Sequence, residues 1–284
     1  MKKTILVFTC SLFIFPVFSQ VEYFGHRGAR GLLPENSIPS FKKALEFPIS
    51  GIEWDVVVNK DNELVISHEP YFKTSICQSN SIDDDELKTY NIYHMSQQEI
   101  EGIDCGLKKT KSFPNQQKIS TSKPTFKQVQ QEIKFGNRTI LFEIKSEEKE
   151  YGISQPFPQK FATLILEEIE ASGLRENIIF MSFDATILNE IYAKDSSLRL
   201  IYLTYKPLVS INKFLSVCTF KPYALGMFYR TISRKKIDAL HKKEIKSFAW
   251  TVNNKKQAAG LIKIGVDGII TDYPDRINHA LITP

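Results

Sequence analysis

The chain has 284 residues, of which 42% are hydrophobic and 24% charged, and its formal net charge is +5. This length is enough for one large α/β domain with a substantial core. The small positive excess is not gathered into a basic run or a Lys/Arg-rich helix face, so nucleic acid is not expected as a partner.

Residues 1–19 have the organisation of a secretory signal peptide. Lys2 and Lys3 precede an apolar stretch over 4–15, and the segment 17–19 resembles a cleavage site. The apolar stretch is shorter than the ~20 residues of a membrane-spanning helix. We therefore expect cleavage near Ser19, no stable membrane insertion, and export of residues 20–284 to the periplasm or the medium as a single domain.

Export would place Cys77, Cys105 and Cys218 in an oxidising compartment, where three cysteines cannot all pair with one another. Cys77 and Cys105 flank one polar segment and form the favoured bridge. Cys218 lies in the apolar stretch FLSVCTF and resembles a buried thiol. Three free cysteines are the alternative.

After the leader, short apolar runs rich in β-branched and aromatic residues alternate with helix-like segments. Strands are predicted at 21–25, 52–58 with 63–68, 139–145, 178–182, 199–203, 224–227, 247–251 and 268–271. Helices are predicted at 38–47, 125–134, 159–172, 185–194, 209–217, 233–242, 255–264 and 275–281. Eight such alternations favour a TIM (β/α)8 barrel over a doubly wound sheet, which usually has fewer strands.

Residues 70–120 interrupt this alternation as an inserted segment after the second strand region, with little sustained periodicity. A long insertion in a regular fold usually lies over an active site or forms a surface excursion. Its acidic run at 83–86 is interpreted as a solvated turn or helix start rather than a calcium site.

Two carboxylates lie on one face of a predicted strand. Glu53 and Asp55 in GIEWDVVV are two residues apart and project from the same side. Trp54 and the following valines indicate a strand buried on both faces, so the carboxylates need a cation or a shared proton. A metal ion is favoured over the alternative, a solvent-facing strand with alternating polar residues.

The stretch LFEIKS repeats this pattern with Glu143 and Lys145. At the carboxyl end of a barrel strand, both side chains would face the same mouth as the first pair. Glu143 would then be a third metal ligand and Lys145 a contact for an anionic substrate, with a structural ion pair as the alternative. Oxygen ligands of this kind favour Mg²⁺ or Ca²⁺ over zinc.

Two histidines stand at the ends of neighbouring strands, His26 after YFG and His68 after LVIS. Each alone could be a packed histidine, but beside three carboxylates they can supply a proton acceptor and a proton donor. The glycine-rich stretch GHRGARGLLPENS, which contains His26, predicts backbone folded tightly around an anion. Trp250 ends another strand and either packs in the core or forms an apolar wall of a substrate pocket.

Together these motifs resemble the glycerophosphodiester phosphodiesterase family. The resemblance runs from HRGARGLLPENSIPSF through GIEWDVVVNKDNELVISHE, FEIK and AWTVN to GVDGIITDYP, and the order and spacing make it specific. It implies a TIM-barrel phosphodiesterase that uses a divalent cation, commonly Ca²⁺ or Mg²⁺. Its small-molecule substrate would be a deacylated phospholipid, hydrolysed to sn-glycerol 3-phosphate and an alcohol such as choline or ethanolamine.

The resemblance also implies a role for each candidate residue, with water or the neighbouring glycerol hydroxyl as the nucleophile. The acid/base pair would be His26 as base and His68 as acid, the metal ligands Glu53, Asp55 and Glu143, the phosphate contacts Arg27 and Lys145, and the pocket wall Trp250.

The chain departs from the family pattern at Glu69, where the family usually has Asp after the histidine. This departure bears on substrate range rather than reaction class, and the insertion corresponds to the family's variable segment, where substrate choice is expected to reside. A related barrel phospholipase of the phosphatidylinositol phospholipase C or sphingomyelinase D type is one alternative, and it would show an exposed apolar rim. A non-catalytic secreted binding protein is the other, and it would have lost a catalytic position.

Overall fold

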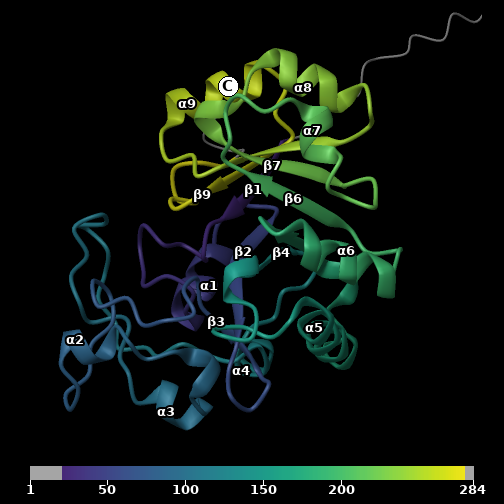
Figure 1. The fold of residues 1–284 in the computed structure, drawn as a ribbon. Helices are drawn as coiled ribbons and strands as arrows, with labels where there is room; N and C mark the ends of the chain where they lie inside the picture. The colour runs from purple at the N-terminus through teal and green to yellow at the C-terminus, as the bar shows by residue number, and fades with distance from the viewer. Residues whose placement is uncertain (1–20, 279–284) are drawn as a thin grey trace, which may run out of the picture.

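A computed structural model describes residues 21–278 and forms a closed barrel of parallel strands (Figure 1). The barrel strands are β1 (Glu22–Gly25), β2 (Gly51–Val58), β4 (Thr139–Ile144), β5 (Ile178–Ser182), β6 (Leu200–Thr204), β7 (Ala224–Phe228), β8 (Lys246–Trp250) and β9 (Gly268–Thr271). The sheet closes because β1 pairs in parallel with both β2 and β9. The predicted TIM (β/α)8 fold is confirmed.

Helices connect the strands, and most begin at a capping side chain that accepts a hydrogen bond from the first turn. The connecting helices are α1 (Ile38–Leu45), α4 (Phe126–Glu132), α5 (Pro158–Ser172), α6 (Ala185–Lys194), α7 (Ile211–Leu215), α8 (Arg234–His241) and α9 (Lys255–Lys263). Ser37, for example, caps α1 through its hydroxyl group, which accepts from the Ser40 amide at 3.3 Å. These elements match the predicted ones to within a few residues.

One predicted helix, at 275–281, is wrong in its described part. Residues 275–276 form a turn and residues 277–278 a bend, and residues 279–281 lie outside the described residues. The side chain of Asn278 donates to the Pro274 carbonyl at 2.6 Å. That carbonyl would accept the backbone amide of Asn278 in a helix, so the side chain replaces the helical bond.

The second predicted strand region is a hairpin. Strand β3 (Leu64–Ile66) pairs antiparallel with β2 and lies outside the closed barrel. The predicted strand at 63–68 therefore ends earlier, and His68 lies in the turn that follows it. The Ser67 amide donates to the Asp55 carbonyl at 3.0 Å, which holds this turn against the end of β2.

The inserted segment 70–120 has more order than its sequence suggests. It forms α2 (Asp84–Leu87), the short 3₁₀ helix η1 (Ile92–His94) and α3 (Gln97–Glu101), which lie to one side of the barrel (Figure 1). Phe72, Leu87 and Ile100 are buried in a hydrophobic cluster that joins the outer face of the β2–β3 hairpin. Asp83 caps α2, so the acidic run is a helix start, as expected.

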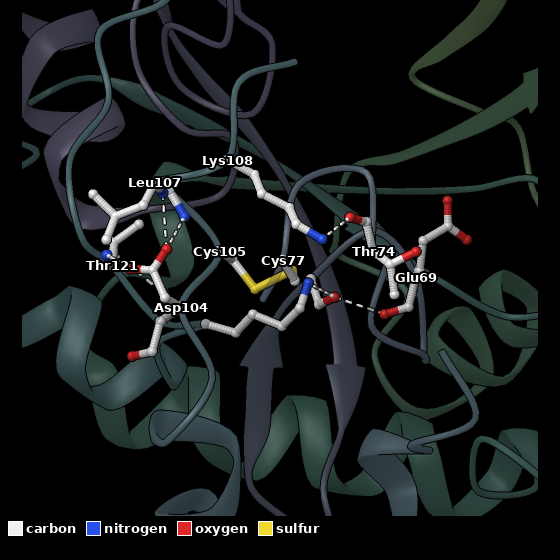
Figure 2. The surroundings of a disulfide bond; sticks show 12 residues. Glu69, Thr74, Cys77, Asp104, Cys105, Leu107, Lys108 and Thr121 are labelled. Atoms are coloured by element: carbon white, nitrogen blue, oxygen red, sulfur yellow. Dashed lines mark hydrogen bonds between the residues drawn. A yellow bond between two sulfur atoms is a disulfide. The ribbon is translucent and has the colours of Figure 1, made fainter. Parts of the chain in front are cut away.

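A disulfide between Cys77 and Cys105 closes this segment across 28 residues (Figure 2). It is the bridge favoured from the sequence, and Cys218 is a half-buried free thiol. Nearby, the Lys108 ammonium group donates to the Thr74 carbonyl at 2.8 Å (Figure 2). The same ammonium group also pairs with Asp84. The insertion is therefore a segment that is cross-linked by a disulfide and has its own buried hydrophobic cluster.

The barrel interior is filled by a separate apolar cluster that includes Phe24, Leu141, Met181 and Phe248. Trp54 lies on the other side of its strand, fully buried among the rings of Phe41, Phe126, Phe135 and Phe142. Both faces of β2 are buried, as the sequence predicts. Within residues 21–278, no helix has the length and apolar character needed to cross a membrane.

Candidate active site

Seven of the eight predicted site residues lie in the barrel strands or directly after them, at the end of the barrel where β1 leads into Arg27. His68 reaches the same place from the turn after β3, which is not a neighbour of β1, so the two histidines do not follow neighbouring strands as expected. A cavity of about 190 Å³ is lined by His26, Arg27, Glu53, His68, Glu143 and Trp250, with apolar side chains such as Met181 and Leu203. Asp55 lies fully buried beside this cavity, and Lys145 lines a larger cleft that adjoins it. The closed barrel and the β2–β3 hairpin together thus bring all eight of the predicted residues to one place.

Three carboxylates form the most buried part of the site. Oxygen atoms of Glu53, Asp55 and Glu143 lie within 4.8 Å of one another, and the pairing of β2 with β4 places Asp55 directly beside Glu143. These side chains come from residues that are only 1%, 0% and 7% exposed. Glu53 Oε1 and Asp55 Oδ1 are buried without a hydrogen-bond partner among the described residues.

The three buried carboxylates repel one another, and a positive charge among them would relieve this repulsion. Burial raises the pKa of Glu53 well above its usual range, and the charges of Asp55 and Glu143 add to the effect. Burial also acts to raise the pKa of Asp55, but His68, Arg27 and Lys145 outweigh it, and the net shift is downward. Buried oxygen atoms with unused lone pairs and repelling charges fit a hard divalent cation.

Lys145 and Arg27 already contact these carboxylates. The Lys145 ammonium group lies 2.6 Å from Glu143 Oε1 and 3.6 Å from Asp55 Oδ1. Arg27 Nε lies 3.2 Å from Asp55 Oδ2, and the Arg27 amide donates to Glu53 Oε2 at 2.8 Å. Lys145 therefore forms an ion pair in this structure, as the alternative interpretation of this residue predicts.

The turn after β1 holds Arg27 in an unusual backbone conformation. Arg27 and Asn36 have φ values of 50° and 53°, in the left-handed region that few non-glycine residues adopt. Gly28, at φ 83°, continues the turn. Asn36 donates from its amide group to Asp55 Oδ2 at 2.9 Å, so this turn is fastened to the carboxylates.

Each site histidine is held by a carboxylate through its Nδ1 atom. His26 Nδ1 lies 2.7 Å from Asp272 Oδ1, and His68 Nδ1 lies 2.8 Å from Glu69 Oε1. The hydrogen bond from His68 lowers the pKa of Glu69 to about 2. Burial acts to raise the pKa of Asp272, but the charge and hydrogen bond of His26 outweigh it and lower that pKa.

Both carboxylates are therefore hydrogen-bond acceptors, and each Nδ1 carries the proton. Nε2 is left in each ring as the atom that can exchange a proton with a substrate. Burial lowers the pKa of His26 despite the opposing charge of Asp272. A neutral His26 with an open Nε2 is suited to accept a proton near neutral pH.

Four supporting residues were not identified as site residues from the sequence. They are Glu35, Asn36, Asn253 and Asp272. Glu35 pairs with both Arg27 and Arg30. Asn36 donates to Asp55, and Asn253 donates to Asp272 Oδ2 at 2.6 Å. Asp272 follows the last barrel strand in GVDGIITDYP, and a carboxylate at a strand end was the signal that could have marked it.

Trp250 forms an aromatic wall of the cavity. Its ring contacts Phe183 edge to face at 5.4 Å between centroids and Phe228 at 5.7 Å. The cavity opens past Phe183 into a cleft of about 750 Å³ that extends along the loops after β4, β5 and β6. Glu147, Asp184 and Tyr205 line this cleft, which gives a substrate room beyond the histidines.

Enzymes with a (β/α)8 fold carry their active sites at this end of the barrel. The molecule therefore has the organisation of a barrel enzyme. The model of the Glycerophosphoryl diester phosphodiesterase family matches residues 26–276, and the chain belongs to this family. The expected family membership and the expectation that the chain is an enzyme are both confirmed.

Relatives with solved structures or known sequences span nearly the whole chain. The glycerophosphodiester phosphodiesterase of Caldanaerobacter subterraneus subsp. tengcongensis is 29% identical over 255 residues, which cover 89% of this chain and 94% of that protein. The Thermotoga maritima glycerophosphodiester phosphodiesterase has a TM-score of 0.65 at 25% identity, covering 90% of this chain and 96% of its own. An Oleispira antarctica phosphodiesterase in complex with the product sn-glycerol-3-phosphate has a TM-score of 0.74 at 20% identity, covering 91% and 95%.

Proposed function

We propose that this chain hydrolyses glycerophosphodiesters to sn-glycerol 3-phosphate and an alcohol, with a divalent cation, Ca²⁺ or Mg²⁺, as cofactor. The observation that carries the proposal is that two histidines, each held by a carboxylate, face one cavity with a group of three buried carboxylates. The product named for the Oleispira antarctica enzyme supports the same reaction.

Glu53, Asp55 and Glu143 would hold the cation, because two of their buried oxygen atoms have no hydrogen-bond partner within residues 21–278. A divalent cation bound there would neutralise the charge that develops on the phosphoryl oxygens. Arg27 and Lys145 would add positive charge beside the same oxygens. Asn36 orients Asp55 and leaves Oδ1 of that carboxylate for the ion.

The two histidines would divide the proton transfers. His26 would accept the proton of the nucleophile at Nε2, because burial favours its neutral form and Asp272 fixes its Nδ1–H. His68 would donate a proton from Nε2 to the departing alkoxide, with its own Nδ1 held by Glu69. Trp250 and Phe183 would exclude water from one side of the substrate.

Activity on purified protein tests this proposal. We expect turnover of glycerophosphocholine that EDTA abolishes and that Ca²⁺ or Mg²⁺ restores. His26→Ala and His68→Ala should each lower kcat by about 10²-fold or more. His94→Ala, at an exposed position of the insertion, is the matched control and should retain full activity. Unchanged hydrolysis in both site variants would overturn the acid/base pair, and EDTA-insensitive activity would overturn the cation.

A second candidate function is hydrolysis of an intact lipid by a phosphatidylinositol phospholipase C or sphingomyelinase D type of reaction. The observation in its favour is the loop after β6, where Tyr205 and Leu208 are 61% and 97% exposed and Tyr205 lines the cleft. Assays of micellar phosphatidylinositol and sphingomyelin beside glycerophosphocholine separate the two. Turnover of lipid alone would establish the second function, and no turnover of any diester would favour a binding protein.

We also propose that the chain is exported after cleavage near Ser19, with residues 20–284 as the mature domain. The leader lies outside the described residues. The Cys77–Cys105 disulfide supports export, because such bonds persist mainly in oxidising compartments. The mass of the protein recovered from the periplasm or medium tests this, and an uncleaved cytoplasmic chain would contradict it.

A further inference from the structure

Lys123 is a buried lysine close to the proposed site but outside its cavities. Only 8% of the residue is exposed, and its ammonium group lies 5.6 Å from the centre of the Phe72 ring. Burying an ammonium group is costly unless it is compensated by charge and hydrogen bonds. An apolar side chain at this position beside Phe72 would avoid that cost in free energy. The buried charge therefore indicates a specific role for the ammonium group.

The ammonium group donates to the Ser67 hydroxyl at 2.8 Å. The Ser67 hydroxyl in turn donates its single proton to the Glu69 carbonyl at 2.6 Å. The direction of both bonds is thus fixed, since an ammonium group has no lone pair with which to accept. Lys123 therefore stands at the start of a hydrogen-bond chain that reaches the backbone on both sides of His68.

This chain ends at Glu69, the residue that also holds the His68 ring. The side chain of Glu69 accepts from His68 Nδ1 at 2.8 Å, and its backbone carbonyl accepts from Ser67. The Ser67 amide is also fixed, because it donates to the Asp55 carbonyl at 3.0 Å. The turn that carries His68 is consequently held at Ser67 by Lys123 and at Glu69 by Ser67.

The other end of the lysine is itself held in place. The Lys123 carbonyl accepts from the Gln97 side chain at 3.1 Å, which ties it to α3 of the insertion. The next carbonyl, of Pro124, accepts from the Ile66 amide at 2.8 Å, and Thr125 forms a bridge with Val65 and caps α4. Lys123 thus connects a fixed point of the insertion with the turn of His68.

We propose that Lys123 is a positioning residue that holds His68 where it can protonate the leaving alkoxide. This inference rests on the proposed function and adds to it a residue from the boundary of the insertion. Burial lowers the pKa of Lys123 to about 8, although the charges of Glu35, Glu69 and Asp55 act in the opposite direction. Replacing the ammonium group removes the hydrogen bond to Ser67 and lets the turn move.

The test compares two leaving groups. Choline and ethanolamine leave as alkoxides that need a proton, whereas p-nitrophenolate leaves readily without one. In Lys123→Met we expect kcat on glycerophosphoethanolamine to fall about 10-fold to 10²-fold, with KM within about threefold. The p-nitrophenyl ester of glycerol phosphate should be hydrolysed within about twofold of the wild-type rate, because its leaving group does not need the acid.

Three further variants make the comparison decisive. Ser67→Ala removes the acceptor with a smaller change and should reproduce the selective loss, so a folding defect in one variant does not decide the result. Lys123→Arg retains a donor and should recover part of the activity. Lys127→Met is the same substitution at an exposed position of α4, where the lysine pairs with Glu168 at 3.8 Å, and it should have no effect.

Equal losses on both substrates would show a general structural role and overturn the inference. So would wild-type rates on glycerophosphoethanolamine in both Lys123→Met and Ser67→Ala. His68→Ala serves as the reference, because it must show the same dependence on the leaving group. If the wild-type protein hydrolyses neither substrate, the proposed function fails and the inference fails with it. If only His68→Ala shows the selective loss, the proposed function stands and the role of Lys123 is overturned.

Discussion

Asp272 accepts a hydrogen bond from Nδ1 of His26 at 2.7 Å, although the two residues are 246 positions apart in the chain. The contact exists because β9 and β1 are neighbours in the closed barrel, and His26 and Asp272 each follow their strand directly. Asn253 holds the other carboxylate oxygen at 2.6 Å. The last and first strands therefore share the task of fixing one imidazole ring.

This relationship predicts the effect of Asp272→Asn. An amide in place of the carboxylate no longer stabilises the imidazolium form, and it can donate to Nδ1 and so select the wrong tautomer. We expect kcat on glycerophosphocholine to fall by about 10²-fold, with little change in KM, in steady-state assays.

Asn253→Ala is the control for this prediction. It removes the two hydrogen bonds that Asn253 makes with Asp272, one to the carboxylate and one from the backbone amide, but leaves the bond to His26, so the loss of kcat should be several times smaller. Wild-type activity in Asp272→Asn would contradict the assignment of His26 as the base.

Cation binding should stabilise the folded protein through Glu53, Asp55 and Glu143. At an ion concentration about 100 times Kd, binding adds about 2.7 kcal/mol to the free energy of unfolding, which corresponds to a rise in Tm of about 5 °C or more. Thermal melts of EDTA-treated protein with added Ca²⁺ or Mg²⁺ measure this rise.

Glu53→Gln removes one of the charges and should abolish most of the rise in Tm. Asp85→Asn lies in the exposed acidic run of the insertion, pairs with Lys88 in the native protein, and should leave the rise intact. Loss of the rise in Asp85→Asn but not in Glu53→Gln would move the cation site to the insertion.

The barrel and its carboxylates could be predicted because they depend on short-range patterns. Alternation along β2 places Glu53 and Asp55 on one face whatever the rest of the fold does. Repeated strand and helix signals then favour a closed barrel, and the barrel places Glu143 beside Asp55.

The supporting residues could not be predicted in the same way, because their contacts depend on tertiary structure. Asp272 reaches His26 only once the barrel has closed, and Lys123 meets Ser67 and the Phe72 ring only in the folded chain. Local sequence patterns predict that the segment 275–278 is helical, and that prediction is wrong. The side chain of Asn278 makes the hydrogen bond that its backbone amide would make in a helix.

Glu35 should make the free energy of unfolding depend on acid pH. Its carboxylate lies 2.8 Å from Arg27 Nη1 and 2.6 Å from Arg30 Nε. Burial acts to raise the pKa of Glu35, but the two guanidinium groups outweigh it and lower the pKa from 4.5 to about 2. Because the folded pKa is below the unfolded one, the stabilisation is present above pH 4.5 and is lost as the pH falls toward 2.

The shift corresponds to about 3 kcal/mol for this nearly buried group. In metal-free buffer, Glu35→Gln should therefore be less stable than wild type at pH 7, and the difference should shrink by up to that amount in denaturant titrations toward pH 2.5. Glu46→Gln, at an exposed pair with Lys43, should show no comparable dependence. A difference that stays constant with pH would contradict the role of Glu35.

The Cys77–Cys105 disulfide should contribute strongly to the stability of the insertion. It closes a loop across 28 residues, and the loop-entropy relation gives about 3 to 4 kcal/mol for a loop of this length. Both cysteines are buried beside Leu87 and Ile100, so alanine rather than serine is the replacement that avoids a buried hydroxyl. Denaturant unfolding of the Cys77→Ala/Cys105→Ala variant measures the loss.

The double variant should also lose activity at elevated temperature. Helix α3 packs in the insertion core, and Gln97 of that helix donates to the Lys123 carbonyl. Cys218→Ala removes the half-buried free thiol and is the control, expected to change stability by about 1 kcal/mol or less. Reduction with dithiothreitol should reproduce the double variant in wild type and have no effect on the double variant. Equal stability of the wild type and the double variant would show that packing against the β2–β3 hairpin holds the insertion without the covalent bond.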